Sequence, residues 1–305
     1  MPIALIILPN FLLIVLGFAL HRWGGFPRAF WAQVEQLIYF LLFPALLFRA
    51  LAKTPIDLTT ATPLILGGLL VMGSGMALSY LAKFLFKPSS MLFASGFQCA
   101  FRFNSYVGLA IAAGWGGQPG IAALALLVGT MIPPANVASV WALAQHGEGN
   151  AWRELLRNPL IIATLSGMAY SLTGLPLPVW IAGTLSPIGD AALPMGLLSV
   201  GAGLKMDAAM NADTQNNSQP KAVMFYWLAV KLLALPVIAW LIGRALALPT
   251  LYAQMLILFA ALPPASSAYI LAARMGGDPI PVAKLITWGT LLSMLTIPLW
   301  IFVFG

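Results

Sequence analysis

Polar side chains that could bind a ligand interrupt one of the most apolar stretches of this chain. Residues 101–105 read Phe-Arg-Phe-Asn-Ser, which places Arg102, Asn104 and Ser105 inside a hydrophobic segment. A guanidinium offers a planar fork of donors that matches a carboxylate, and an asparagine amide both donates and accepts hydrogen bonds. The segment therefore predicts a binding site for a small organic anion.

A second interruption lies nearer the C-terminal end, where residues 262–267 read Leu-Pro-Pro-Ala-Ser-Ser. Pro263 and Pro264 cannot donate backbone hydrogen bonds, and proline disfavours helix at the residue before it. The hydroxyls of Ser266 and Ser267 follow at once, where freed carbonyls need partners and a ligand can approach the backbone. We expect a broken helix that contributes to the same site.

Two further polar residues lie close to prolines within apolar runs. Asn136 ends the segment Ile-Pro-Pro-Ala-Asn, where it either satisfies backbone groups freed by a kink or reaches the site. Asp190 precedes Pro194 by about one helical turn, and a buried carboxylate titrates upward when it is desolvated. Asp190 is thus a candidate for proton coupling, with a structural hydrogen bond as the alternative.

Other ionisable residues in apolar runs are functional candidates by default, because charge is costly at membrane depth. Glu35 and Arg49 lie near the ends of one run, where we expect them to snorkel to the interface. Lys231 lies deeper, and a scaffold ion pair explains it as well as a transport role does. Arg102 either meets a substrate carboxylate or pairs with a carboxylate such as Asp190.

The composition shows what kind of fold must hold these residues. Of 305 residues, 61% are hydrophobic and 8% charged, and the mean hydropathy is +0.93. Soluble domains carry about 25% charged residues, and a membrane-spanning helix needs about 20 apolar residues. The chain is therefore expected to be an all-α integral membrane protein, with ten spans near residues 3–20, 33–51, 61–86, 91–115, 120–144, 159–174, 179–204, 222–246, 251–273 and 280–304.

The basic residues indicate how these spans are oriented. They gather in the odd-numbered connections, which the positive-inside rule assigns to the cytoplasm. We therefore expect a multi-pass protein of the cell (inner) membrane, with both termini on the non-cytoplasmic side and the polar stretch Met206 to Gln219 inside. The net charge of +7 then reflects topology rather than nucleic-acid binding.

The two halves of the chain share a pattern of helix-breaking residues. An offset of 150 aligns Pro9, Gly17, Gly24 and Pro44 with Pro159, Gly167, Gly174 and Pro194, and beyond the polar stretch the offset becomes 160. Such residues could also merely recur at loop spacing. Interpreted as a repeat, residues 1–150 and 151–305 form two five-helix units of opposite orientation. That architecture is typical of secondary transporters, whose substrate sites lie where broken helices meet; here these are spans four and nine.

The chain resembles the auxin efflux carrier family, which includes plant auxin carriers and bacterial carriers for malonate and malate. The resemblance lies in residues 40–48 (Phe-Leu-Leu-Phe-Pro-Ala-Leu-Leu-Phe), 104–109 (Asn-Ser-Tyr-Val-Gly-Leu), 158–162 (Asn-Pro-Leu-Ile-Ile), 193–204 (Leu-Pro-Met-Gly-Leu-Leu-Ser-Val-Gly-Ala-Gly-Leu) and the Pro-Pro segment at 262–267. It implies ten helices in two inverted repeats, a substrate pocket at the crossing of helices four and nine, and an elevator-like movement.

We therefore expect a secondary transporter for a small organic carboxylate anion, linked to protons or driven by the membrane potential. A sodium-coupled symporter resembling the bile-acid carriers and a membrane sensor without transport remain alternatives. An enzyme is not expected, because no carboxylate pair, HExxH motif or Ser-His dyad lies at membrane depth. No cofactor or metal site is expected either, since His21, His146 and Cys99 stand apart. The small residues Gly67, Gly68, Gly73 and Gly75 fit a homodimer as well as contact within one chain.

Overall fold

The computed structural model describes residues 3–53, 58–144, 159–204 and 218–304, and within these ranges it contains helices and no strands. The prediction of an all-α protein is confirmed. The polar stretch expected in the cytoplasm lies outside the described residues as far as residue 217. The helices are α1 (Ile3–Arg22), α2 (Arg28–Leu37), η1 (Ile38–Leu42), α3 (Phe43–Lys53), α4 (Leu58–Leu85), α5 (Ser90–Gly96), η2 (Phe97–Ala100), α6 (Ser105–Ala144), α8 (Pro159–Leu172), α9 (Val179–Ala202), α11 (Ser218–Ala229), η3 (Val230–Ala234), α12 (Leu235–Ala245), α13 (Thr250–Ala261), α14 (Ser267–Arg274) and α15 (Pro279–Phe304).

Six helical segments of the described chain are long and apolar enough to cross a membrane. They are Arg28–Lys53, Ala61–Leu85, Ser90–Leu143, Val179–Ala202, Lys221–Ala245 and Pro279–Phe304. Three shorter apolar helices accompany them, namely Leu8–Arg22, Pro159–Leu172 and Thr250–Ala261. These lengths and compositions make the chain a multi-pass membrane protein, while the number of ten crossings stays a prediction.

Glycine and proline set the boundary inside the longest helical segment. Gly117 in α6 has φ 58° and ψ −149°, a backbone conformation that glycine adopts without steric cost. Pro119 follows, and its missing N–H suits the first turn of a new helix. The label α6 therefore covers two helices that meet at Gly117, between the spans that the sequence predicts at 91–115 and 120–144.

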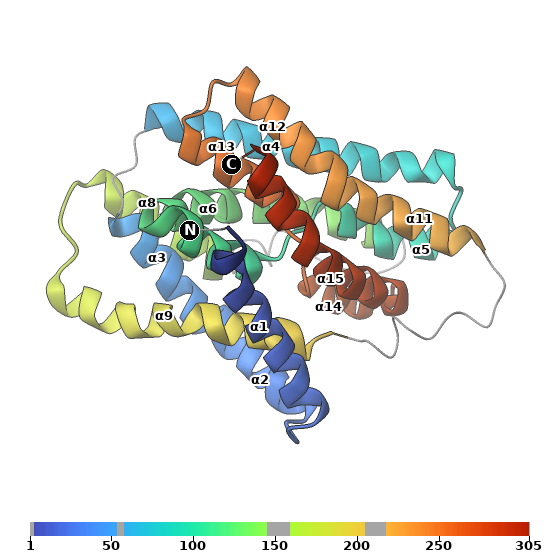
Figure 1. The fold of residues 1–305 in the computed structure, drawn as a ribbon, viewed down its shortest axis with the longest axis horizontal. Coiled ribbons are helices and arrows are strands. Elements are labelled where there is room, and N and C mark those ends of the chain that lie inside the picture. Colours follow the sequence, from blue (N-terminus) through green and yellow to red (C-terminus); the bar gives the residue numbers. More distant parts are fainter. Residues whose placement is uncertain (1–2, 54–57, 145–158, 205–217, 305) are drawn as a thin grey trace.

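The helices form two groups, which contact each other mainly through α6. In the first bundle, which comprises α1, α2, α3, α8 and α9, the closest partners are α1 with α9 and α3 with α8. In the second bundle, which comprises α4, α5, α6 and α11 to α15, the helices pack around α13. Figure 1 shows α1 and α9 along the lower edge of the molecule and α4 and α12 along the upper edge.

Glycines permit the closest helix contacts of the first bundle. A Cβ atom at Gly17 of α1 would collide with the backbone of Leu198 in α9, and one at Gly167 of α8 would lie 3.0 Å from the carbonyl oxygen of Phe48 in α3. The offset of 150 that relates Gly17 to Gly167 also relates Phe48 to Leu198. The α1–α9 and α8–α3 contacts therefore use corresponding residues of the two halves, with the partners exchanged.

Candidate functional site

Both helices in which the sequence predicts an interruption are broken in the structure. The helical turn that ends at Ala100 is followed by residues 101–104 without helix before α6 begins, and residues 262–265 separate α13 from α14. The second break is explained by Pro263 and Pro264, which cannot donate to the helical ladder. At the first break Asn104 caps α6, since its Oδ1 accepts from the backbone N–H groups of Tyr106 at 3.1 Å and Val107 at 3.3 Å.

The two interruptions touch each other. The backbone N–H of Asn104 donates to the carbonyl oxygen of Pro263 over 2.9 Å, although the residues are far apart in sequence. Gly108, one turn into α6, leaves room for the side chain of Leu262. A Cβ atom at this position would lie 2.7 Å from Cδ1 of Leu262. Broken backbone from each half of the chain thus meets in the buried interior of the second bundle.

Arg102 links the two breaks through its side chain. Its Nη1 donates to Oε1 of Gln98 over 3.2 Å and its Nη2 donates to Oγ of Ser267 over 2.9 Å. The residue is only 9% exposed, and no carboxylate of the described chain lies within salt-bridge distance of it. The alternative in which Arg102 pairs with Asp190 is therefore not what the structure shows. A buried guanidinium held by neutral groups alone keeps its charge available to an anion.

Asn104 presents an unused donor at the same place. It is 2% exposed, and its Nδ2 has no hydrogen-bond partner among the described residues. Oδ1 accepts the two hydrogen bonds that cap α6, so a flip of the amide, which would exchange Oδ1 and Nδ2, would break the cap. Nδ2 therefore stays directed away from the helix. A buried donor without a partner costs about 1–3 kcal/mol, and a ligand acceptor would remove that cost.

Gln98 is a residue of this site that sequence reasoning missed. It is fully buried, accepts from Arg102, and donates through Nε2 to the carbonyl oxygens of Ser95 at 3.2 Å and Ala268 at 3.3 Å. It therefore positions the guanidinium and ties the two breaks together. Its spacing of four residues from Arg102 within an apolar run was the signal that could have identified it.

The other predicted site residues are placed less centrally. Ser105 begins α6 and Ser266 forms the turn before α14, so both flank the breaks, and both are half-buried. Asn136 is half-buried in the later part of α6. Their participation in binding stays a prediction.

Asp190, the candidate for proton coupling, lies in the first bundle. Its Oδ1 accepts from Nη2 of Arg49 over 2.6 Å, while Nη1 of Arg49 donates to the carbonyl oxygen of Ser186 over 3.0 Å. Arg49 is 6% exposed, so the expectation that it snorkels to the interface was wrong. It was wrong because a carboxylate on α9, which the local sequence does not reveal, pairs with Arg49. The side chain of that carboxylate is 66% exposed, so the burial expected for Asp190 is not found.

Lys231 is a second buried cation of the second bundle. It is 1% exposed and lies in the π-helical turn η3, with Nζ 6.0 Å from the ring centroid of Phe259. That ring packs on Phe103 of the first break with centroids 4.5 Å apart. No carboxylate of the described chain forms a salt bridge with Lys231, so the scaffold ion pair considered for it is not found there.

The apolar helices identify an integral membrane protein, in which two broken helices meet beside a buried cation. Residues 146–301 match the model of the family described as membrane transport protein. This match spans half of the chain, and the chain belongs to that family, which the sequence resemblance identified as the auxin efflux carrier family.

Named relatives agree with this assignment. A Rhizobium meliloti (strain 1021) protein named "Putative malonate transporter" is 24% identical over 315 aligned residues, which cover 96% of this chain and 92% of the relative. An "Uncharacterized transporter" of Methanothermobacter thermautotrophicus is 26% identical and covers 96% of both chains. The "Auxin efflux carrier component 2" of Arabidopsis thaliana is 25% identical over 167 residues, 53% of this chain and 24% of the plant protein.

Proposed function

We propose that the protein is a secondary transporter that moves a small organic carboxylate anion across the membrane by alternating access. One observation carries the proposal. Where the two helix breaks meet, the buried guanidinium of Arg102 is bonded only to uncharged groups of the described chain, next to the unpartnered amide donor of Asn104. A carboxylate would satisfy both donors at once.

The charge balance of the second bundle favours an anionic substrate. Its described ranges, 58–144 and 218–304, contain eight Lys and Arg residues and a single acidic residue, Asp278. Two of the cations, Arg102 and Lys231, are buried without a carboxylate from the described chain. A cation substrate would have to enter this field against repulsion, whereas an anion is attracted. The name of the Rhizobium meliloti relative points to the same class, since malonate is a small dicarboxylate.

We further propose that the ten predicted spans form two inverted repeats, with spans four and nine crossing at the site. The exchanged contacts of Gly17 with Leu198 and of Gly167 with Phe48 support this, because a two-fold relation between the halves produces such pairs. The meeting of Asn104 with Pro263 supports the crossing, since these residues lie in the corresponding spans.

An elevator-type movement fits the boundary between the two bundles. Tyr106, directly after the first break, lies between Gly196 of α9, where a Cβ would stand 3.1 Å from its ring, and Phe43 of α3, whose ring centroid is 4.6 Å away. The flat ring of Tyr106 lies against Gly196, which has no side chain, so few side chains interlock at this contact and the two surfaces can slide past each other. We infer that the second bundle carries the substrate site along the first bundle. The coupling ion stays open: it is a proton, with Asp190 as candidate, or sodium, as in the alternative symporter, or there is none.

Flux into proteoliposomes tests the transport function. Purified protein should take up labelled malonate or a related carboxylate with saturation, and Arg102→Ala should abolish the uptake. Arg244→Ala, which removes an exposed cation at the end of α12, is the matched control and should leave uptake intact. Carboxylate binding without flux would favour a membrane sensor, and uptake that requires sodium would favour the symporter related to bile-acid carriers.

The proposed orientation is tested separately. A cysteine placed at Asn216, in a background where Cys99→Ser removes the natural thiol, should resist an impermeant thiol reagent in intact cells. It should react in inverted membrane vesicles, because the stretch between the halves is expected in the cytoplasm. Labelling in intact cells alone would reverse the orientation of the whole chain.

A further inference from the structure

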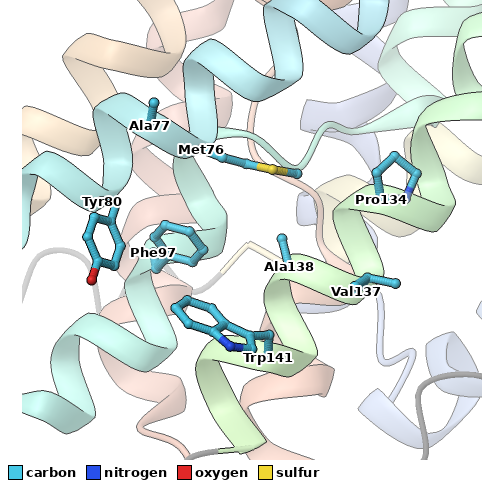
Figure 2. A pocket seen from close by; sticks show the side chains of 8 residues that line it. All are labelled: Met76, Ala77, Tyr80, Phe97, Pro134, Val137, Ala138 and Trp141. Carbon is cyan, nitrogen blue, oxygen red and sulfur yellow. The ribbon is translucent and has the colours of Figure 1, made fainter.

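An apolar groove of about 560 Å³ lies between α4 and the later part of α6. Met76 and Tyr80 of α4 line one wall and Pro134 and Trp141 of α6 line the other, with Phe97 at the base (Figure 2). Ala77, Val137 and Ala138 complete the lining of the groove. Both walls belong to segments that are long and apolar enough to cross a membrane.

One end of the groove is aromatic and basic. Figure 2 shows Met76 and Pro134 at one end and Tyr80 and Trp141 at the other. Beyond this second end, Nζ of the exposed Lys83 lies 5.7 Å from the ring centroid of Tyr80 and 5.8 Å from that of Phe93. An ammonium next to tyrosine and tryptophan is the arrangement found at the membrane–water interface.

The helices that form the groove carry no acidic residue of their own. The sequence contains neither Asp nor Glu between residues 58 and 147, which includes all of α4, α5 and α6. Lys87 lies just beyond the end of α4 and is also exposed. An amphiphile whose acyl chain fills the groove would therefore place its headgroup beside two cations that lack a competing carboxylate in these helices.

We propose that this groove binds an acyl chain of an anionic phospholipid, whose phosphate pairs with Lys83. An apolar groove alone would accept any lipid, but the basic end selects a headgroup with net negative charge. Such lipids are concentrated in the cytoplasmic leaflet, and the connection between the predicted spans 61–86 and 91–115, which contains Lys87, is expected on that side. Only this choice of leaflet rests on the proposed orientation; binding in the groove does not depend on the transport function.

The bound lipid reaches the back of the anion site. Phe97 at the base of the groove packs on Phe101 with ring centroids 5.0 Å apart, and Phe101 precedes Arg102 in the first break. Gln98, which holds the guanidinium, is the residue next to Phe97. A lipid that fills the groove thus supports the turn from which Gln98 and Arg102 extend, and its binding stabilises the folded protein.

The test compares two phospholipids with identical acyl chains. Full-length protein in a neutral detergent is titrated with phosphatidylglycerol or phosphatidylcholine, while native mass spectrometry counts bound lipid and thermal unfolding is followed in parallel. Phosphatidylglycerol should give the more abundant one-lipid adduct and the larger rise in the unfolding midpoint. Lys83→Gln should remove this preference, Lys83→Arg should keep it, and Arg244→Gln, with the same loss of charge elsewhere, should also keep it.

Filling the groove provides an independent variant. Ala138→Trp should reduce binding of both lipids while leaving Lys83 in place. Equal binding of the two lipids by the unaltered protein, or a preference that survives Lys83→Gln, would overturn the proposal. A protein dimer that Ala138→Trp dissociates would instead assign the groove to a second copy of the chain. If Ala138→Trp fails to fold, the adduct ratio of the Lys83 variants still decides the question.

Discussion

Arg49 and Arg102 are two buried arginines with opposite surroundings. Arg49, in the first bundle, donates to the carboxylate of Asp190 at 2.6 Å. Arg102, in the second bundle, donates to the neutral oxygens of Gln98 and Ser267. The first guanidinium has its counter-ion within the protein, so it joins α3 to α9. The second has none in the described chain, so it is equipped to receive one from outside.

The two sites also differ in the exposure of the groups that hold each arginine. Arg49 has a side chain 7% exposed, but the side chain of its partner Asp190 is 66% exposed. At Arg102 the acceptor Ser267 is exposed while Gln98 is fully buried. The guanidinium of Arg102 lies where the two broken helices meet, whereas that of Arg49 joins α3 to α9. We expect the same residue type to stabilise the fold in one bundle and to bind substrate in the other.

The largest expected effect follows from removing Arg102. Because hydrogen bonds to charged groups contribute about 1.5–3 kcal/mol each, two lost bonds to a carboxylate should weaken binding by at least about 100-fold in Arg102→Ala. Arg49→Met should bind the anion with unchanged affinity, since its charge serves the α3–α9 contact. Isothermal titration with malonate in detergent measures both.

Thermal stability separates loss of binding from loss of folding in this comparison. If Arg102→Ala stays folded and binds the anion normally, the substrate role of Arg102 is wrong. The second change Asp190→Asn is not expected to rescue Arg102→Ala, because Asp190 pairs with Arg49. A rescue would mean that the two arginines exchange one carboxylate during the cycle.

The next effect concerns stability in the first bundle. Asp190→Asn leaves the buried guanidinium of Arg49 without its counter-ion, whereas Arg49→Met leaves a carboxylate that is mostly exposed and can be hydrated. Breaking a fully buried pair costs about 3–5 kcal/mol, so Asp190→Asn should approach the lower end of this range and Arg49→Met should cost clearly less. Chemical unfolding in detergent gives both values.

The variant Asp190→Asn also tests proton coupling at this carboxylate. If Asp190 carries the coupled proton, Asp190→Asn should abolish the pH dependence of malonate uptake even in protein that remains folded. An unaltered pH dependence in folded Asp190→Asn protein leaves this carboxylate with a structural role only.

Local features of this site could be predicted from the sequence, but its long-range partners could not. Pro263 and Pro264 forbid a regular helix wherever they occur, and Arg102 and Asn104 are conspicuous in an apolar run. In contrast, the ion pair of Arg49 with Asp190 spans 141 residues, and nothing in either neighbourhood selects the other. Helix packing makes that choice, through close contacts such as that of Gly189 with Leu46, where a Cβ would lie 3.1 Å from the Cα.

A smaller effect is expected when Arg102 keeps its charge but changes its shape. Arg102→Lys retains a cation, yet an ammonium cannot donate in parallel to two carboxylate oxygens, and its shorter stem leaves Gln98 or Ser267 without a donor. We expect the affinity for malonate to fall about tenfold, which corresponds to the loss of one hydrogen bond to a charged group. Full affinity in Arg102→Lys would reduce the role of Arg102 to its charge.

The smallest effect should come from Ser267, which accepts one hydrogen bond from Arg102 at 2.9 Å. Without this hydroxyl the guanidinium remains bonded to Gln98 but can rotate about that contact. A net hydrogen bond contributes about 1 kcal/mol, so Ser267→Ala should weaken malonate binding about fivefold. Ser266→Ala, one residue earlier in the same turn, tests the other predicted hydroxyl: a comparable loss of affinity would extend the site to Ser266, and normal binding would confine the effect to the residue that holds Arg102. Tighter binding in Ser267→Ala would show instead that the hydroxyl occupies the place of a substrate oxygen and is displaced when the anion enters.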